Sequence, residues 1–318
     1  MTMACIADTP LYVILAARAD RHNDGAVRHC HDACRLRTAG NRRETGAVVL
    51  LHVIERGPDV PVDAPGGTPG ARPPSTPVVF LHGLFGRARN LGFLQRQAAR
   101  TRRTLALDLR GHGDSPHGPI DYPGLAADVI ETLAHHNALP ATIIGHSMGG
   151  KTAMIVALTH PEAVSGLLIA DMAPARTGHG QSDFARAMLG LRFPPSMDRA
   201  QAAALLEPLV PGRAVRDLML QNVRLGDEPG WSIAMPQIVD ALINIENWPY
   251  IPEGHVYPGP TLFVSGGQSP YVRPEHRPVM RQLFPNSRAM RIEEAGHWLH
   301  VEEPRKFSAI MNAFLTEN

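Results

Sequence analysis

The chain has 318 residues, 44% of them apolar, which is enough for one large α/β domain with an insertion or for two small domains. Basic and acidic residues number 31 and 30, so the net charge of +1 argues against nucleic acid or an anionic membrane as the main partner. No apolar run approaches the roughly 20 residues that cross a bilayer, so we expect a soluble protein without a membrane span.

Residues 1–46 differ in composition from the rest and are expected to form a poorly ordered extension. All three cysteines lie in this segment, so the remainder can form no disulfide and a reducing, cytoplasmic location is expected. The run 29–34 has metal-ligand residue types, but no second cluster completes a zinc site, which favours a solvated tail. The apolar run 11–15 is too short for a secretory signal. An organellar presequence remains an alternative, although four aspartates argue against it.

Two apolar strands separated by a long loop open the body of the chain. We expect a strand at 47–54, a loop over 57–77 because this stretch is dense in proline and glycine, and a second strand at 78–81. The second strand leads into His82-Gly83-Leu84-Phe85-Gly86. Glycines just past a strand let the backbone approach a ligand closely.

The following segments alternate between helix and strand. A helix is expected over 90–100, a strand over 104–108 and a helix over 122–136. Asp108 and Asp114 are interpreted as turn residues near the strand ends. The glycines around position 112 lack the rest of a nucleotide-binding fingerprint, so no cofactor is predicted there.

The stretch 141–150 joins a short apolar strand to a helix through a serine between two glycines. It contains Gly145-His-Ser-Met-Gly149, the G-x-S-x-G pattern of a nucleophile elbow. In this turn the glycines keep side chains out of a crowded space, which exposes the serine hydroxyl. The helix that follows presents free backbone N–H groups to the carbonyl under attack. Ser147 is therefore the candidate nucleophile, and the Met148 amide is a candidate oxyanion donor.

The pattern changes after a strand at 166–170. Residues 175–259 contain several helical stretches, such as 199–208 and 236–245, with no strand expected between them. This pattern predicts an inserted helical cap.

Alternation resumes after the cap, with strands at 261–265 and 289–292 and helices at 275–284 and 304–315. Strands that alternate with helices indicate a mainly parallel, doubly wound α/β sheet covered on both faces. We expect this core to comprise residues 47–174 and 260–318, with ligands bound at the carboxyl ends of the strands.

Three motifs in this order resemble the α/β-hydrolase fold: His82-Gly83 after an early strand, Gly145 to Gly149 at the elbow, and Gly296-His297 after the last strand. Longer stretches look like those of small bacterial carboxylesterases close to the mammalian abhydrolase-domain 11 proteins, namely 145–151, 171–174, 266–272 and 296–300. The resemblance covers about residue 47 to the end. It implies a serine hydrolase that requires no metal and no cofactor.

A serine hydroxyl needs a base that removes its proton, and 16 histidines compete for this role. His297 follows the last strand and completes the chain order serine, acid, histidine of this fold, so it is the predicted base. His82 is assigned to the oxyanion loop and His146 to the variable position of the elbow. His300 is expected to pack or to meet solvent.

The third catalytic member should be a buried carboxylate that orients the histidine. In most members of this fold it follows the seventh strand, here 261–265, but the loop 266–273 contains no acid. Asp171 directly follows the preceding strand and is the predicted acid, with a helix cap or turn residue as the alternative. The resemblance to the esterase branch implies the same, with Ser269 hydrogen-bonding within the site as a fourth member. Glu275 lies several residues past the usual position.

By analogy with the fold, the Leu84 amide supplies the second oxyanion donor. The predicted function is cleavage of a small-molecule ester or thioester through an acyl-enzyme. Because a cap limits the length of the acyl chain, short to medium acyl groups are expected. The alternatives are an acyltransferase or a cofactor-free haloperoxidase on the same fold, and a non-catalytic binding protein. The oligomeric state is left open.

Overall fold

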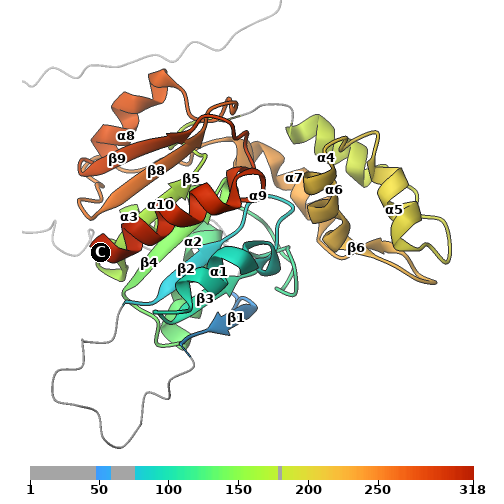
Figure 1. Cartoon of the computed structure of the whole chain (residues 1–318), viewed down its shortest axis with the longest axis horizontal. Helices are drawn as coiled ribbons and strands as arrows, with labels where there is room; N and C mark the ends of the chain where they lie inside the picture. The colour runs from blue at the N-terminus through green and yellow to red at the C-terminus, as the bar shows by residue number, and fades with distance from the viewer. Residues whose placement is uncertain (1–47, 59–75, 178–180) are drawn as a thin grey trace, which may run out of the picture. The chain divides into compact units, whose positions relative to one another are not determined.

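The computed structural model describes residues 48–58, 76–177 and 181–318 (Figure 1). The predicted extension 1–46 and most of the predicted loop 57–77 lie outside the described residues. The described residues belong to one compact unit, residues 45–318.

A seven-stranded sheet forms the centre of this unit (Figure 1), with the strand order β1-β3-β2-β4-β5-β8-β9. All neighbouring strands are parallel except β1, which pairs antiparallel with β3. The predicted mainly parallel α/β fold is therefore confirmed. The strands are β1 Val53–Arg56, β2 Val78–Leu81, β3 Thr104–Leu107, β4 Ala141–His146, β5 Val164–Ala170, β8 Thr261–Gly266 and β9 Ser287–Ile292.

Helices pack on both faces of the sheet. Apolar side chains of α2, α3 and α8 belong to one buried cluster, and those of α1, α9 and α10 belong to a second. The strands other than the edge strand β9 contribute side chains to both clusters, because successive side chains of a strand point to opposite faces. These helices are α1 Gly92–Ala98, α2 Tyr122–His135, α3 Met148–Thr159, α8 Arg277–Leu283, α9 Leu299–Glu302 and α10 Pro304–Glu317.

The segment between β5 and β8 is mainly helical, and residues 181–246 of it are called the inserted segment below. It contains α4 Gln181–Leu189, α5 Arg199–Leu206, α6 Arg213–Met219 and α7 Met235–Glu246. The expectation that it holds no strand is wrong, since Val223–Arg224 (β6) and Gly230–Trp231 (β7) form a small antiparallel sheet. Two-residue strands are too short to show alternation in a sequence, and the turn between them depends on Gly226, whose φ is +93°.

The first strand begins later than its sequence indicates. A strand was predicted at 47–54, but β1 starts at Val53. The amides of Val49 and Leu51 donate instead to side chains of α2, at Asp128 Oδ1 (2.9 Å) and Thr132 Oγ1 (3.0 Å). An apolar run in the sequence does not show whether its backbone amides will bond to a neighbouring strand or to side chains.

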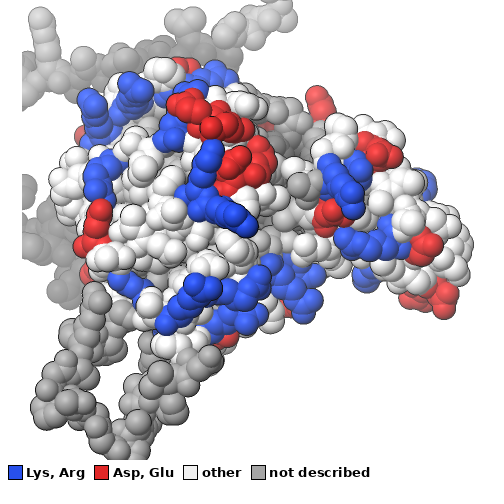
Figure 2. Space-filling view, in the orientation of Figure 1, with Lys and Arg blue, Asp and Glu red and all other residues white. Residues whose placement is uncertain are grey.

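Charge is unevenly spread over the face in Figure 2. Arg side chains gather over α1 and β1, where Arg56, Arg89 and Arg96 border a hollow of about 490 Å³. Elsewhere on this face both signs are interspersed. Among the described residues, no helix combines the length and the apolar character needed to cross a membrane.

Candidate active site

The turn from β4 into α3 places Ser147 at the carboxyl edge of the sheet. Ser147 has φ 54° and ψ −117°, a backbone conformation that L-residues rarely adopt. A Cβ on Gly145 would lie 2.3 Å from the Gly149 carbonyl oxygen, and one on Gly149 would lie 2.4 Å from that of Leu81. Only glycine fits at both positions, which explains the spacing of the motif. The resulting turn directs Ser147 into a pocket.

The His297 ring lies beside the serine hydroxyl. Its Nε2 is 3.0 Å from Ser147 Oγ, and its Nδ1 is 2.7 Å from Asp171 Oδ2. A carboxylate only accepts hydrogen bonds, so Nδ1 carries the proton and Nε2 is left to accept the proton of Ser147. The Tyr271 ring stacks on the imidazole, with ring centroids 3.9 Å apart and an angle of 17° between the planes.

The backbone around His297 is held by two other side chains. Glu302 accepts from the amides of Gly296 (2.7 Å) and Trp298 (3.1 Å). His146 Nε2 donates to the His297 carbonyl at 2.8 Å. Burial lowers the pKa of His146 well below its usual value, so this ring is neutral at physiological pH.

Asp171 is fully buried directly after β5, in the left-handed backbone region with φ 49°. Its Oδ1 accepts from the Gly266 amide at 2.9 Å, and its Oδ2 accepts from Ser269 Oγ as well as from His297. The Ser269 hydroxyl in turn accepts from the Tyr271 amide at 3.3 Å. The four residues predicted from the sequence, Ser147, His297, Asp171 and Ser269, thus form one hydrogen-bonded series.

The other acids between β8 and His297 interact elsewhere. Glu275 has a 62% exposed side chain and lies 3.6 Å from Arg273. Glu293 and Glu294 pair on the surface with Arg291 (3.0 Å) and Lys306 (2.8 Å). None of these three carboxylates has a hydrogen bond to His297 within the described part of the chain.

The loop after β2 carries the predicted oxyanion donor Leu84, which lines the same pocket as Met148 and Ser147. His82 and His112 hold this loop. His82 Nε2 accepts from the Leu109 amide (2.9 Å) while its Nδ1 donates to the Gly83 carbonyl (2.8 Å). The Phe85 amide donates to His112 Nε2 at 3.3 Å.

Both of these rings act as neutral imidazoles. Burial lowers the pKa of His82, and it lowers that of His112 to about 3. From the inserted segment, the Asn222 side chain donates to the Phe85 carbonyl. Phe85 itself has φ 61°, so this loop is held in a strained conformation from two sides.

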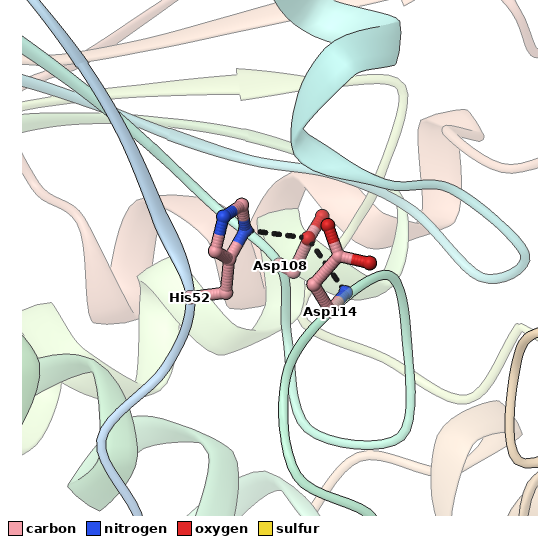
Figure 3. Close-up of side chains that lie close together, drawn as sticks. All are labelled: His52, Asp108 and Asp114. Atoms are coloured by element: carbon pink, nitrogen blue, oxygen red, sulfur yellow. Dashed lines mark hydrogen bonds and ion pairs between the residues drawn. The ribbon is translucent and has the colours of Figure 1, made fainter.

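His52, Asp108 and Asp114 lie close together near the end of β3 (Figure 3) and have the residue types of a metal site. The carboxylate of Asp108 already accepts from Ala88 N (2.6 Å), Asp114 N (2.9 Å) and His52 Nδ1 (2.9 Å). Asp114 itself pairs with Arg87 at 3.1 Å. Protein donors therefore use the oxygens that an ion would need, and the cluster fits a structural turn rather than a metal centre.

The sequence profile of the alpha/beta hydrolase fold matches residues 76–304, more than half of the chain. The chain belongs to the alpha/beta hydrolase fold family. One family member, the mouse sn-1-specific diacylglycerol lipase ABHD11, is 37% identical over 75% of this chain and 80% of that protein. The esterase YbfF of Escherichia coli is 33% identical over 76% of this chain and 94% of that protein. Among solved structures, a marine microorganism esterase has a TM-score of 0.74 at 27% identity, covering 84% of this chain and 99% of that one.

Several residues that shape the site were not predicted from the sequence. His146, Tyr271 and Glu302 all contact the His297 segment, yet none of them stands at a position that a motif or a period marks for that role. Tyr271 lies within the stretch 266–272, and the resemblance of this stretch to the esterases is the one sequence feature that indicated this part of the loop.

Proposed function

We propose that this chain is a serine hydrolase that cleaves carboxylic esters of short to medium acyl chain through an acyl-enzyme. The hydrogen-bonded series from Ser147 through His297 to buried Asp171, with distances of 3.0 and 2.7 Å, carries this proposal. The names of the relatives, an esterase and a diacylglycerol lipase, support ester cleavage.

In the first half of the reaction, Ser147 Oγ attacks the ester carbonyl carbon while its proton passes to His297 Nε2. Asp171 stabilises the imidazolium that forms. The carbonyl oxygen becomes an oxyanion, which accepts from the amides of Leu84 and Met148, and each such donor contributes about 10²–10³ in rate. The tetrahedral intermediate then collapses, the bond to the leaving oxygen breaks, and His297 returns the proton to the departing alcohol.

In the second half, water attacks the carbonyl of the acyl-Ser147 ester and gives its proton to His297. Collapse of this second intermediate releases the carboxylic acid and restores the serine hydroxyl with that proton. The same groups therefore serve both halves in reversed roles. A thiol leaving group fits the same steps, so thioester cleavage is the alternative that differs only in the substrate.

We assign residues 175–259 the role of a cap over the site and residues 47–174 and 260–318 that of the catalytic core. Ile245 and Glu246 of this cap line the pocket together with Ser147. Leu84, Met148, Met172, Tyr271 and Trp298 add apolar surface to the same pocket. Hydrolysis of soluble butyrates is accordingly expected to exceed that of long-chain emulsified esters.

The test is labelling with an active-site-directed fluorophosphonate, followed by turnover of p-nitrophenyl esters. The parent protein should be labelled and active, whereas Ser147→Ala and His297→Ala should each lose turnover while remaining folded, because members of such a series act as a unit. A folded parent that is not labelled would favour the non-catalytic binding protein. Turnover of acyl-thioesters well above that of matched esters would favour a thioesterase.

A further inference from the structure

Lys151 is a buried cation that the proposed mechanism does not use. It lies in α3 one helical turn after Ser147, its side chain is fully buried, and it is one of only two lysines in the chain. Removing an ammonium group from water is costly unless polar groups replace its hydration. Nζ donates to the carbonyls of Ile245 (3.3 Å), Glu246 (3.0 Å) and Asn247 (2.9 Å).

These three carbonyls form the carboxyl-terminal end of α7. The last carbonyls of a helix have no N–H partner within the helix, and a cation at that end also interacts favourably with the helix dipole. Two further donors reach the same carbonyls, since Tyr122 Oη donates to Ile245 (2.7 Å) and the Thr177 amide donates to Glu246 (2.9 Å). The end of α7 is therefore held from three separate parts of the chain.

The residues at this end also bound the catalytic pocket. Ile245, Glu246, Tyr122 and Thr177 line the pocket that contains Ser147. Lys151 itself is not among the lining residues, and its ammonium group bonds to α7 rather than to the serine. Any displacement of the α7 end consequently changes the pocket without a change in the reacting groups.

We propose that Lys151 is a positioning residue that sets the acyl-chain selectivity of the pocket by fixing the carboxyl-terminal end of α7. This inference rests on the proposed function for its substrate, but the contacts that carry it do not involve Asp171 or His297. Loss of Lys151 removes one donor from each of three carbonyls, although two of these carbonyls keep the donors Tyr122 and Thr177. The end of α7 is then held less tightly and moves toward water, and the pocket admits longer acyl groups.

A role in folding and a role in selectivity have different readouts. Lys151→Met removes the donor but keeps the carbonyl acceptors, and each acceptor left unsatisfied lowers stability. Met has nearly the length of Lys and no donor, so Lys151→Met is expected to fold while its pocket changes. A measurement of stability therefore tests the role of Lys151 in folding, and the selectivity for acyl chains tests its role in positioning α7.

A pH-dependent readout follows from the same contacts. Burial lowers the pKa of Lys151 to about 7, and Glu246 acts against this shift. The Tyr122 ring lies 5.6 Å from Nζ, and burial raises the pKa of its phenol well above 10, so it stays neutral here. When Lys151 loses its proton it keeps two donors for three carbonyls. Selectivity for short acyl chains should then relax as the pH rises through 7.

The experiment compares kcat/KM for p-nitrophenyl octanoate and p-nitrophenyl butyrate in the parent, Lys151→Met, Tyr122→Phe and the surface control Lys306→Met. The ratio of the two substrates cancels the titration of the general base, which is common to both. The octanoate to butyrate ratio should rise about tenfold in Lys151→Met. This change is comparable to the discrimination in kcat/KM that an apolar pocket achieves for one methylene. In Tyr122→Phe, which removes one donor to Ile245, it should rise less. Lys306→Met should match the parent.

The parent ratio should also rise between pH 6 and pH 8, and this rise should be absent in Lys151→Met. An unchanged ratio in folded Lys151→Met, at every pH, overturns the inference while the proposed function stands. If Lys151→Met does not fold, an unchanged ratio in Tyr122→Phe overturns it instead. A parent that neither hydrolyses these esters nor is labelled by a fluorophosphonate removes the proposed function, and this inference with it.

Discussion

At the scale of single residues, Asp171 is predicted to be the acid that orients His297. Asp171→Asn keeps the shape of the side chain but removes the charge that orients His297, a change that costs about 10⁴ in kcat in a serine protease. Ser269→Ala removes one hydrogen bond to that carboxylate and should cost about 10- to 100-fold. Steady-state turnover of p-nitrophenyl butyrate measures both.

Glu275→Gln is the matched control, because Glu275 is the acid that the more usual position in this fold would suggest. Its side chain is exposed and pairs with Arg273, so turnover should stay close to that of the parent. A dead Glu275→Gln together with an active Asp171→Asn would show that the acid is assigned to the wrong strand.

At the scale of elements, the turn from β4 into α3 depends on two glycines. A Cβ on Gly149 would lie 2.4 Å from the Leu81 carbonyl oxygen and 2.5 Å from that of His82. Because these are backbone atoms of β2 and its loop, they cannot move without separating α3 from the sheet. Gly149→Ala should therefore lower the free energy of unfolding by about 3 kcal/mol, measured from the urea midpoint.

The control for this substitution is Gly212→Ala at the start of α6, where no atom lies within 4 Å of the added Cβ. Its urea midpoint should match that of the parent. Equal midpoints for both alanine variants would mean that the turn adapts to a side chain, and that the glycine spacing has another cause.

At the scale of the whole molecule, buried neutral histidines make stability depend on pH. Burial lowers the pKa of His112 and of His300 from 6.5 to about 3. Between these values the unfolded chain binds more protons than the folded chain, so stability falls as the pH falls from 6.5 toward 3. Each imidazole contributes about 1.4 kcal/mol per pH unit in this window. Urea midpoints at pH 7 and pH 5 should show the loss.

His300→Gln should reduce this pH dependence, because glutamine does not titrate. His135→Gln, at an exposed position on α2, should leave it unchanged. Identical pH dependence in the parent and in His300→Gln would mean that His300 already carries its proton in the folded protein.

The sequence by itself determined the features that depend on neighbouring residues. The strand, the turn and the helix around Ser147 are adjacent in the sequence, and a Cβ on Gly145 would meet the Gly149 carbonyl oxygen four positions on. The need for glycine at 149 is not local, because its Cβ would meet the carbonyl oxygens of Leu81 and His82. The alternation of apolar strands and helices likewise sufficed for the parallel sheet, since helices that connect parallel strands cover both faces of the sheet. These local rules failed where a strand has two residues, as in β6 and β7, or where side chains replace a strand partner, as at Val49 and Leu51.

Only the tertiary structure decided which distant groups meet. Asp171 and His297 are 126 residues apart, yet the loops that follow β5 and β9 bring them within 2.7 Å, on either side of the neighbouring strand β8. The sequence named both residues from their order and from a missing acid, but it did not indicate the stacked Tyr271, the donor His146 or the contact of Lys151 with α7. Such contacts depend on the direction in which side chains point between elements that are distant in the sequence, and no local pattern encodes that direction.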